Sequence, residues 1–170
     1  MGRDKALVEV DGVAMADRVI AAVGGAGIES VVVYGGDTDA LADLSAPVVA
    51  DAYPGEGPMG GVLGALQHFD GIATHVLVLA CDLARIDAGT LRSLIDEATG
   101  DAHSSVWVAA TERLEPMCAL WAMSAVGQIE AAFAGGERTA HRVIGGLPHV
   151  AVTVADDALQ NINTPDDIAR

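Results

Sequence analysis

Apolar runs and stretches with helical spacing alternate along the first hundred residues. Short runs of mostly branched apolar residues occur at three places: VVV at 31–33, VVA at 48–50 and VLVLA at 76–80. Such runs are typical of strands that are covered on both faces, as in a parallel sheet. Apolar residues at helical spacing occur in three other stretches: 14–23, 60–69 and 88–98. This alternation predicts an α/β layered fold with a mostly parallel central sheet and right-handed crossovers.

The pattern changes after Gly100. Two apolar stretches, 105–110 and 116–121, are separated by a polar segment and predict a pair of strands. Further helices are expected at about 124–134 and 139–144, followed by a strand near 149–154. No internal repeat or low-complexity linker interrupts the 170 residues, so a single domain over residues 1–170 is predicted.

Polar residues with ligand-binding character follow the predicted strands. Asp51 follows the second run, Asp82 follows the third, and Gly35 and Gly36 follow the first. Ligands of open parallel sheets bind beyond the carboxyl ends of the strands, so these residues are expected at the ligand-binding edge. Two carboxylates at one edge repel each other unless a cation lies between them. A hydrated Mg²⁺ that carries phosphates meets this requirement, because it takes oxygen ligands and often only one or two carboxylates.

Composition and charge narrow the class of partners. The formal net charge of −15 disfavours binding to nucleic acid and to an anionic membrane surface. The two cysteines, Cys81 and Cys118, lie in apolar surroundings without a CxxC pattern, which favours reduced thiols and a cytoplasmic protein. No signal peptide or membrane-spanning run is recognised, and the five scattered histidines show no zinc-site spacing.

Two of the aspartates have competing interpretations. Asp51 precedes a loop rich in glycine and proline that ends near Gly60, where a helix is expected to begin. Such a loop lets the backbone approach a flat ligand, and a helix N-terminus suits an anion, but a surface turn with an Asp cap is the alternative. Asp82 either caps a helix or binds a metal or phosphate. The next helix begins only near Asp87, which weakens the capping interpretation.

Several other polar residues remain open on the sequence alone. Lys5 is either a surface lysine or a point charge for phosphate oxygens. Arg138 and Arg142, at helical spacing, form either a solvated face or a grip on an anionic substrate. A helix cap explains Thr164 in the segment NINTPDD at 161–167, but it does not explain Asn161 and Asn163. The two tryptophans fall in the predicted strand pair and are interpreted as core or interface residues.

Four motifs in order give the chain a family resemblance: MGRDKAL at 1–7, GPMGGV at 57–62, CD at 81–82 and NINTPDD at 161–167. Together they resemble the molybdenum cofactor guanylyltransferases, within the wider group of MobA-like nucleotidyltransferases. The resemblance implies a three-layer, Rossmann-like fold and a Mg²⁺-dependent reaction. In that reaction GTP and Mo-molybdopterin are joined to give the guanine dinucleotide cofactor, and pyrophosphate is released.

The resemblance also assigns roles to residues of this chain. Lys5 matches the family's phosphate-binding lysine, and Asp82 matches the aspartate that holds Mg²⁺ and the nucleotide phosphates. Asp51 matches an aspartate of the guanosine site, and Gly60 belongs to the nucleotide-binding loop. Asn161 and Asn163 match asparagines at the pterin side of the cleft.

The beginning of the chain departs from the family pattern. Family members usually open with a strand and a loop of the form LAGGxSxRMG, and MGRDKAL resembles the end of that loop. The chain is therefore expected to be an N-terminally shortened form. The alternatives are a related transferase that uses CTP or another phosphate acceptor, and an inactive relative that binds molybdoenzymes or other cofactor-assembly proteins.

Overall fold

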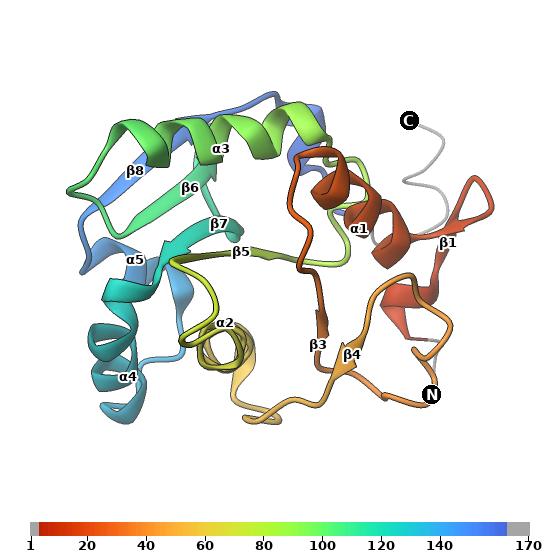
Figure 1. Cartoon of the computed structure of the whole chain (residues 1–170), viewed down its shortest axis with the longest axis horizontal. Coiled ribbons are helices and arrows are strands. Elements are labelled where there is room, and N and C mark those ends of the chain that lie inside the picture. Colours follow the sequence, from red (N-terminus) through yellow and green to blue (C-terminus); the bar gives the residue numbers. More distant parts are fainter. Residues whose placement is uncertain (1–3, 163–170) are drawn as a thin grey trace. The chain divides into compact units, whose positions relative to one another are not determined.

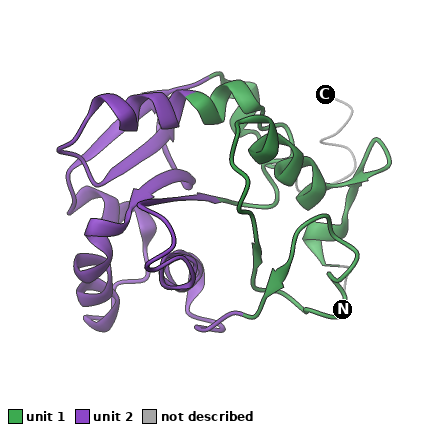
Figure 2. Cartoon of the chain, viewed as in Figure 1, with its two compact units in different colours: residues 1–50, 79–92, 155–170 green, residues 51–78, 93–154 purple. Residues whose placement is uncertain are grey.

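The computed structural model describes residues 4–162, which form two compact units (Figure 2). Within the described residues, unit 1 comprises residues 4–50, 79–92 and 155–162, and unit 2 comprises residues 51–78 and 93–154. The division falls inside strand β5 (His75–Leu79) and inside helix α3 (Ala88–Gly100), so each of these elements contributes residues to both units.

Unit 1 begins with a short 3-10 helix, η1 (Lys5–Leu7), and a tight hairpin. The hairpin pairs β1 (Glu9–Val10) with β2 (Val13–Ala14) in antiparallel register. Asp11 and Gly12, which connect the two strands, have φ angles of 54° and 77°. Positive φ at both central residues is the geometry of the two-residue turn that matches the twist of the strands. The apolar pattern did not predict this hairpin, although Asp-Gly between two valines is a known signal for it.

Helix α1 (Met15–Gly25) follows the hairpin directly and packs into the core of unit 1. It buries Met15, Ala16, Val19 and Val23, which lie on one side of the helix. Two apolar clusters surround it, one formed by Ala6, Ala16, Leu41 and Leu44, the other by Val10, Met15, Ala84 and Ile162. Residues from the beginning, the middle and the end of the chain therefore share one core.

A parallel pair of short strands completes this unit. Strand β3 (Val33–Tyr34) pairs with β4 (Val48–Val49), so β3 begins two residues later than the apolar run at 31–33 predicts. The partner strand is only two residues long, which limits the length of the regular pairing. A last 3-10 helix, η3 (Asp156–Leu159), precedes the end of the described chain.

Unit 2 is built on a four-stranded sheet in the order β5-β7-β6-β8. Strand β6 (Val106–Ala110) is antiparallel to β7 (Leu114–Ala122) and parallel to β8 (His149–Thr153). All five residues of β6 are buried, as expected of a strand covered on both faces. The strand pair predicted at 105–110 and 116–121 is confirmed, and Trp107 and Trp121 are core residues of it.

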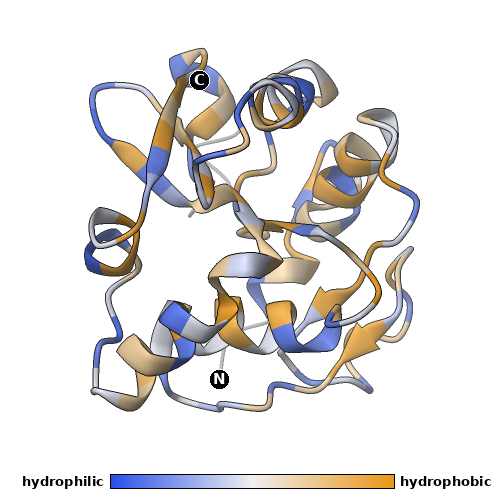
Figure 3. Cartoon of the chain, turned by 60° about the vertical axis from the view of Figure 1, so that its left-hand side comes forward, coloured by the Kyte–Doolittle hydropathy of each residue, from blue (hydrophilic) through white to orange (hydrophobic). Residues whose placement is uncertain are grey.

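Helices cover both faces of this sheet. Figure 1 shows the C-terminal part of α3 on one side, and α2 (Gly57–His68) and α4 (Val126–Ala134) on the other. Helix α2 packs on α4, and α5 (Ala140–Gly145) packs on β7. Most helices are two-sided, with hydrophobic and hydrophilic residues on different faces (Figure 3). This layered arrangement confirms the predicted α/β class.

One predicted helix start and one predicted helical pair of residues are wrong. Helix α2 begins at Gly57 and not at Gly60, because Pro58 fits the first turn of a helix and extends it towards the loop. Helix α5 begins at Ala140, so Arg138 lies before the helix and does not share a face with Arg142. The carboxylate of Glu137 accepts the N–H groups of Arg138 and Thr139 and thereby holds a turn in front of α5. Among the helices of residues 4–162, none combines the length and apolarity needed to cross a membrane.

Candidate functional site

The structure brings Lys5 and Asp82 together from positions 77 residues apart. The Nζ atom of Lys5 donates to Oδ2 of Asp82 at 2.6 Å. The Lys5 side chain is 41% exposed and that of Asp82 is 19% exposed, so the carboxylate is the more enclosed partner. An ammonium group at this distance supplies a positive charge to a carboxylate that is partly withdrawn from water.

Asp82 lies in the turn that follows β5 and has no role in capping a helix. The cap of α3 is Asp87, whose carboxylate accepts the N–H groups of Gly89 and Thr90 at 2.7 and 3.0 Å. The hydrogen bonds from Thr90, first that of its N–H and then that of its hydroxyl, lower the pKa of Asp87. Asp82 is therefore available for other chemistry, as the gap in sequence between the two aspartates predicts.

Asp4, Gly36 and Cys81 surround the pair in unit 1. Asp4 accepts the N–H of Ala6 through Oδ1 and thereby begins the turn that contains Lys5. A Cβ atom on Gly36, whose φ is 84°, would lie 2.6 Å from Leu41 Cδ1 and 3.5 Å from Asp4 Oδ2, so this position requires glycine. Burial raises the pKa of the Cys81 thiol, Asp82 and Asp4 raise it further, and Lys5 lowers it.

The segment that contains Asn161 runs beside Asp82. The N–H of Ile162 donates to the backbone carbonyl of Asp82 at 3.0 Å, and Gln160 accepts from Arg85 at 3.2 Å. Asn161 lies between these two anchored residues and is exposed. Three predicted site residues, Lys5, Asp82 and Asn161, thus belong to one part of unit 1. The other predicted asparagine, Asn163, lies outside the described residues.

The two other predicted residues lie in unit 2: Asp51 in the loop before α2, and Gly60 in the first turn of that helix. Oδ1 of Asp51 accepts the N–H of Tyr53 at 2.8 Å, and the N–H of Glu56 donates to the carbonyl of Tyr53 at 3.1 Å. These hydrogen bonds form a surface turn that Asp51 caps, which is one of the two interpretations that the sequence left open. They leave Oδ2 of Asp51 outside the turn, so the structural role does not use the whole carboxylate.

Close packing explains why residue 60 is a glycine, and the sequence did not reveal this packing. A Cβ atom at this position would lie 3.0 Å from Tyr53 Cβ and 3.1 Å from both Glu56 Cβ and the Tyr53 carbonyl oxygen. The loop therefore folds back against the first turns of α2, and only glycine leaves room for it.

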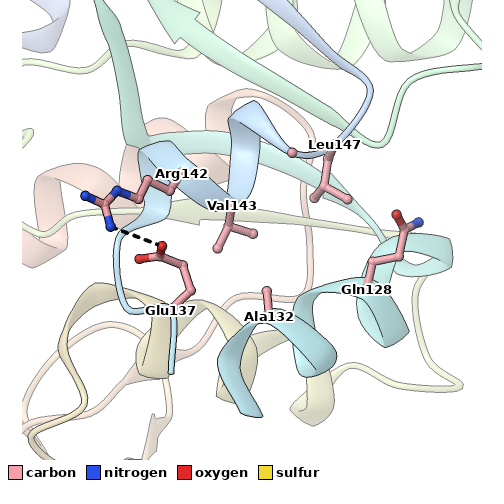
Figure 4. Close-up of a pocket in the computed structure, with 7 residues that line it drawn as sticks. Gln128, Ala132, Glu137, Arg142, Val143 and Leu147 are labelled. Atoms are coloured by element: carbon pink, nitrogen blue, oxygen red, sulfur yellow. Dashed lines mark ion pairs between the residues drawn. The ribbon is translucent and has the colours of Figure 1, made fainter. Parts of the chain in front are cut away.

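The arginines predicted as a solvated face or an anion grip have separate partners. Arg138 pairs with Glu56 at 2.5 Å, and Arg142 pairs with Glu137 at 3.6 Å. Arg142 also lines a pocket of about 210 Å³ between α4 and α5, together with apolar side chains such as Val143 and Leu147 (Figure 4). None of the five predicted site residues that the structure describes lines this pocket.

The donor atoms around Asp82 suit a metal ion that binds together with a nucleotide. No group of three or more His, Cys, Asp and Glu side chains within residues 4–162 is arranged to hold a metal ion. Mg²⁺ often takes only one or two protein carboxylates when phosphates and water supply its other ligands. Asp82 therefore fits a metal–nucleotide complex and does not form a resident metal cage.

Comparison with known proteins places the whole chain among nucleotidyltransferase sequences. The family model described as "MobA-like NTP transferase domain" matches residues 1–153. The chain is 34% identical to the molybdenum cofactor guanylyltransferase of Rhodobacter capsulatus, covering 100% of this chain and 87% of that protein. It is 32% identical to the probable molybdenum cofactor guanylyltransferase of Chloroflexus aggregans, covering 81% and 70% of the two chains.

Solved structures show the same fold. The molybdopterin-guanine dinucleotide biosynthesis protein A of Archaeoglobus fulgidus superposes with a TM-score of 0.77 at 24% identity, covering 98% of this chain and 87% of that chain. The 2-C-methyl-D-erythritol 4-phosphate cytidylyltransferase of Thermus thermophilus gives 0.73 at 16% identity, covering 99% and 92%. These matches confirm the three-layer, Rossmann-like class with a mostly parallel central sheet that the sequence predicts.

Sequence reasoning missed two sets of residues. The first set is Asp4 with its surroundings: the motif at 1–7 contains Asp4, but its proximity to Cys81 and to Gly36 is a tertiary property. The second set is Tyr53 and Glu56, together with the contact that Arg138 makes, because Arg138 is 82 residues away from its partner Glu56. No local pattern connects residues at such a separation.

Proposed function

Because the chain belongs to the family of MobA-like NTP transferase domains, we propose that it is a guanylyltransferase of molybdenum cofactor biosynthesis. It joins the GMP part of GTP to the phosphate of Mo-molybdopterin and releases pyrophosphate. The names of the relatives support this choice of substrates, since the one at 34% identity that spans this chain is a molybdenum cofactor guanylyltransferase.

One observation of the structure carries the proposal. The ammonium group of Lys5 and the carboxylate of Asp82 are in contact at 2.6 Å, in the turn after β5. Transfer of a nucleotidyl group depends mostly on positioning and on neutralising the phosphate charges, so a cation beside a carboxylate that caps no helix suits this chemistry.

Each residue has a defined part in the proposed reaction. Lys5 donates to phosphate oxygens of GTP and stabilises the negative charge that builds up as the bond to pyrophosphate breaks. Asp82 holds Mg²⁺, which when bound supplies charge neutralisation at the phosphates. A phosphate oxygen of the acceptor forms the new bond to the α-phosphorus of GTP, and pyrophosphate leaves with the electron pair of the broken bond.

The remaining predicted residues are proposed to bind the two substrates. The loop with Asp51 and Gly60 receives the guanosine, with one carboxylate oxygen of Asp51 outside the turn. Asn161 and Asn163 contact the pterin side of the acceptor. The protein is proposed to act in the cytoplasm, where its reduced cysteines are stable.

The test is a calorimetric titration of GTP, CTP and ATP, each with Mg²⁺, into the wild-type chain and into two variants. Asp82→Asn removes the metal-binding carboxylate, and Asp96→Asn removes the same charge from an exposed position of α3. We expect GTP binding by the wild type and by Asp96→Asn, and at least tenfold weaker binding by Asp82→Asn.

Each other outcome has a defined meaning. Preference for CTP would mean that the protein is a related transferase that uses CTP and not a guanylyltransferase. Equal GTP binding by Asp82→Asn and the wild type would exclude the role of Asp82. No binding of any of the three nucleotides would favour the inactive binding module. Mass spectrometry of the product formed from GTP and Mo-molybdopterin then identifies the acceptor.

A further inference from the structure

Arg138 makes more contacts than an exposed ion pair requires. Its Nε donates to Oε2 of Glu56 at 2.5 Å, and its Nη1 donates to the carbonyl oxygens of Phe133 and Glu137 at 2.6 and 3.2 Å. The guanidinium carbon also lies 3.7 Å from the centroid of the Phe133 ring. The planar guanidinium group allows stacking and donation at the same time, which an ammonium group does not.

The contacts continue from Phe133 to the loop of Asp51. The rings of Phe133 and Tyr53 meet edge to face with centroids 5.0 Å apart. The backbone N–H of Tyr53 donates to Asp51, and its hydroxyl donates to Gln67 at 2.9 Å, which in turn donates to Glu130 at 2.9 Å. Glu56 and Tyr53 are therefore both fixed from the side of α4 and the segment that follows it.

This loop depends on external support because of its own composition. Gly55 and Gly57 have φ angles of 81° and 71°, so the backbone passes twice through the region that favours glycine. Glycine has the largest conformational freedom in the unfolded loop, and fixing it is unfavourable in entropy. A loop that must present Asp51 in one position consequently gains from contacts that immobilise Tyr53 and Glu56.

We propose that Arg138 is a positioning residue for nucleotide binding. It holds Glu56 and the ring of Phe133, these hold the loop at 51–57, and the loop presents Asp51 to the nucleotide. The inference rests on the proposed function, because it assumes that Asp51 contacts the nucleotide. Preformed loops bind with less loss of conformational freedom, so the role of Arg138 lies in affinity and not in the chemical step.

The test compares Arg138→Met and Arg138→Lys with Arg113→Met, which removes the same charge from an exposed turn of unit 2. We expect Arg138→Met to raise the KM for GTP about tenfold and to leave kcat within about twofold. Arg138→Lys keeps the charge opposite Glu56 but loses the planar guanidinium group that stacks on Phe133. The KM of this variant for GTP should therefore lie between those of the wild type and Arg138→Met. Arg113→Met behaves as the wild type.

Hydrogen exchange of the protein without nucleotide gives a second readout. The amides of Tyr53 and Glu56, which donate within the loop, should exchange about tenfold faster in Arg138→Met and at the wild-type rate in Arg113→Met.

Two results would overturn the inference. Unchanged exchange in Arg138→Met would show that Arg138 does not hold the loop, and faster exchange with an unchanged KM would show that the loop position does not matter for the nucleotide. A wild-type chain that binds no nucleotide would instead overturn the proposed function and, with it, the nucleotide role of Arg138. The exchange data would then still show whether Arg138 fixes the loop.

Discussion

At the scale of single residues, Lys5 holds the carboxylate of Asp82 through an ammonium group 2.6 Å from Oδ2. The same carboxylate is proposed to hold Mg²⁺, so lysine and metal are competing cations in the protein without nucleotide. The triphosphate changes this relation, because its oxygens can accept both positive charges. Lys5 therefore has opposite effects on the binding of Mg²⁺ alone and of the nucleotide.

Replacing Lys5 by methionine tests this relation. We expect Lys5→Met to bind Mg²⁺ about fivefold more tightly than the wild type in the absence of nucleotide, because a competing charge is removed. The same variant should bind GTP with Mg²⁺ more weakly, since the cation on the phosphates is lost. Titration of Mn²⁺ followed by electron paramagnetic resonance measures the first effect and calorimetry the second. Two affinities unchanged from the wild type would contradict the assignment of Lys5.

Cys118 allows a second prediction at the scale of single residues, on how the stability of the fold depends on pH. Burial and, as a smaller cause, the nearby Glu115 together raise the pKa of its thiol from about 9 to about 12. The unfolded chain ionises first, so the stability that the neutral thiol contributes is present below pH 9 and is lost as the pH rises towards 12. Urea denaturation at several pH values should therefore show a steeper alkaline loss for the wild type than for Cys118→Ala. Parallel curves for the two proteins would exclude this contribution.

At the scale of elements, the start of α2 depends on the contact between Gly60 and the loop before it. Gly60→Ala places a Cβ atom 3.0 Å from Tyr53 Cβ and should destabilise the fold by about 1–3 kcal/mol. Gly61→Ala is the matched control, because no atom lies within 4 Å of its new Cβ. Alanine favours the helix there, so this variant should gain about 0.5–1 kcal/mol. Equal free energies of unfolding in urea for the two variants would contradict the close packing at Gly60.

The N-terminus of α3 depends on Asp87, whose carboxylate accepts hydrogen bonds from Gly89 and Thr90. Asp87→Ala should lower the free energy of unfolding by about 1 kcal/mol at pH 7, whereas Asp87→Asn keeps a capping oxygen and most of this stability.

The same cap has a predictable pH dependence. The pKa of Asp87 is lowered in the folded protein, so its charge contributes stability above the unfolded pKa near 3.8, and this is lost as the pH falls through the lower folded value. The difference between the wild type and Asp87→Asn should thus shrink as the pH falls below the unfolded pKa. A difference that is independent of pH would contradict the charge contribution.

At the scale of the whole molecule, the formal net charge of −15 acts on both units. Like charges at this density repel one another in the compact state, and salt screens them over about 10 Å at 0.1 M. The midpoint of urea denaturation should therefore rise between about 10 and 200 mM NaCl, as the Debye length shortens. A constant or falling midpoint would mean that local ion pairs such as Lys5–Asp82 outweigh the net repulsion. Mg²⁺ titrations accordingly need a control at matched ionic strength.

Much of the element order was predictable because the hydrophobic period is a local property. The runs at 48–50 and 76–80 became β4 and β5, and the stretch at 88–98 became α3. The hairpin of β1 and β2 was missed because its strands have only two residues each, too few for a period to appear. Arg138 was misassigned to a helical face because Glu137 accepts backbone N–H groups and delays the start of α5.

The sequence by itself determined the α/β class, the motif residues that indicate the family, and the separation between Asp82 and the true helix cap Asp87. These features follow from the hydrophobic period and from the spacing of motif residues, both of which are properties of residues close together in the chain. Only the tertiary structure decided that Lys5 reaches Asp82, that β7 lies between β5 and β6, and that Arg138 contacts Glu56. The physical reason is that such contacts join residues far apart in the chain, and their geometry is set by the packing of buried side chains between them.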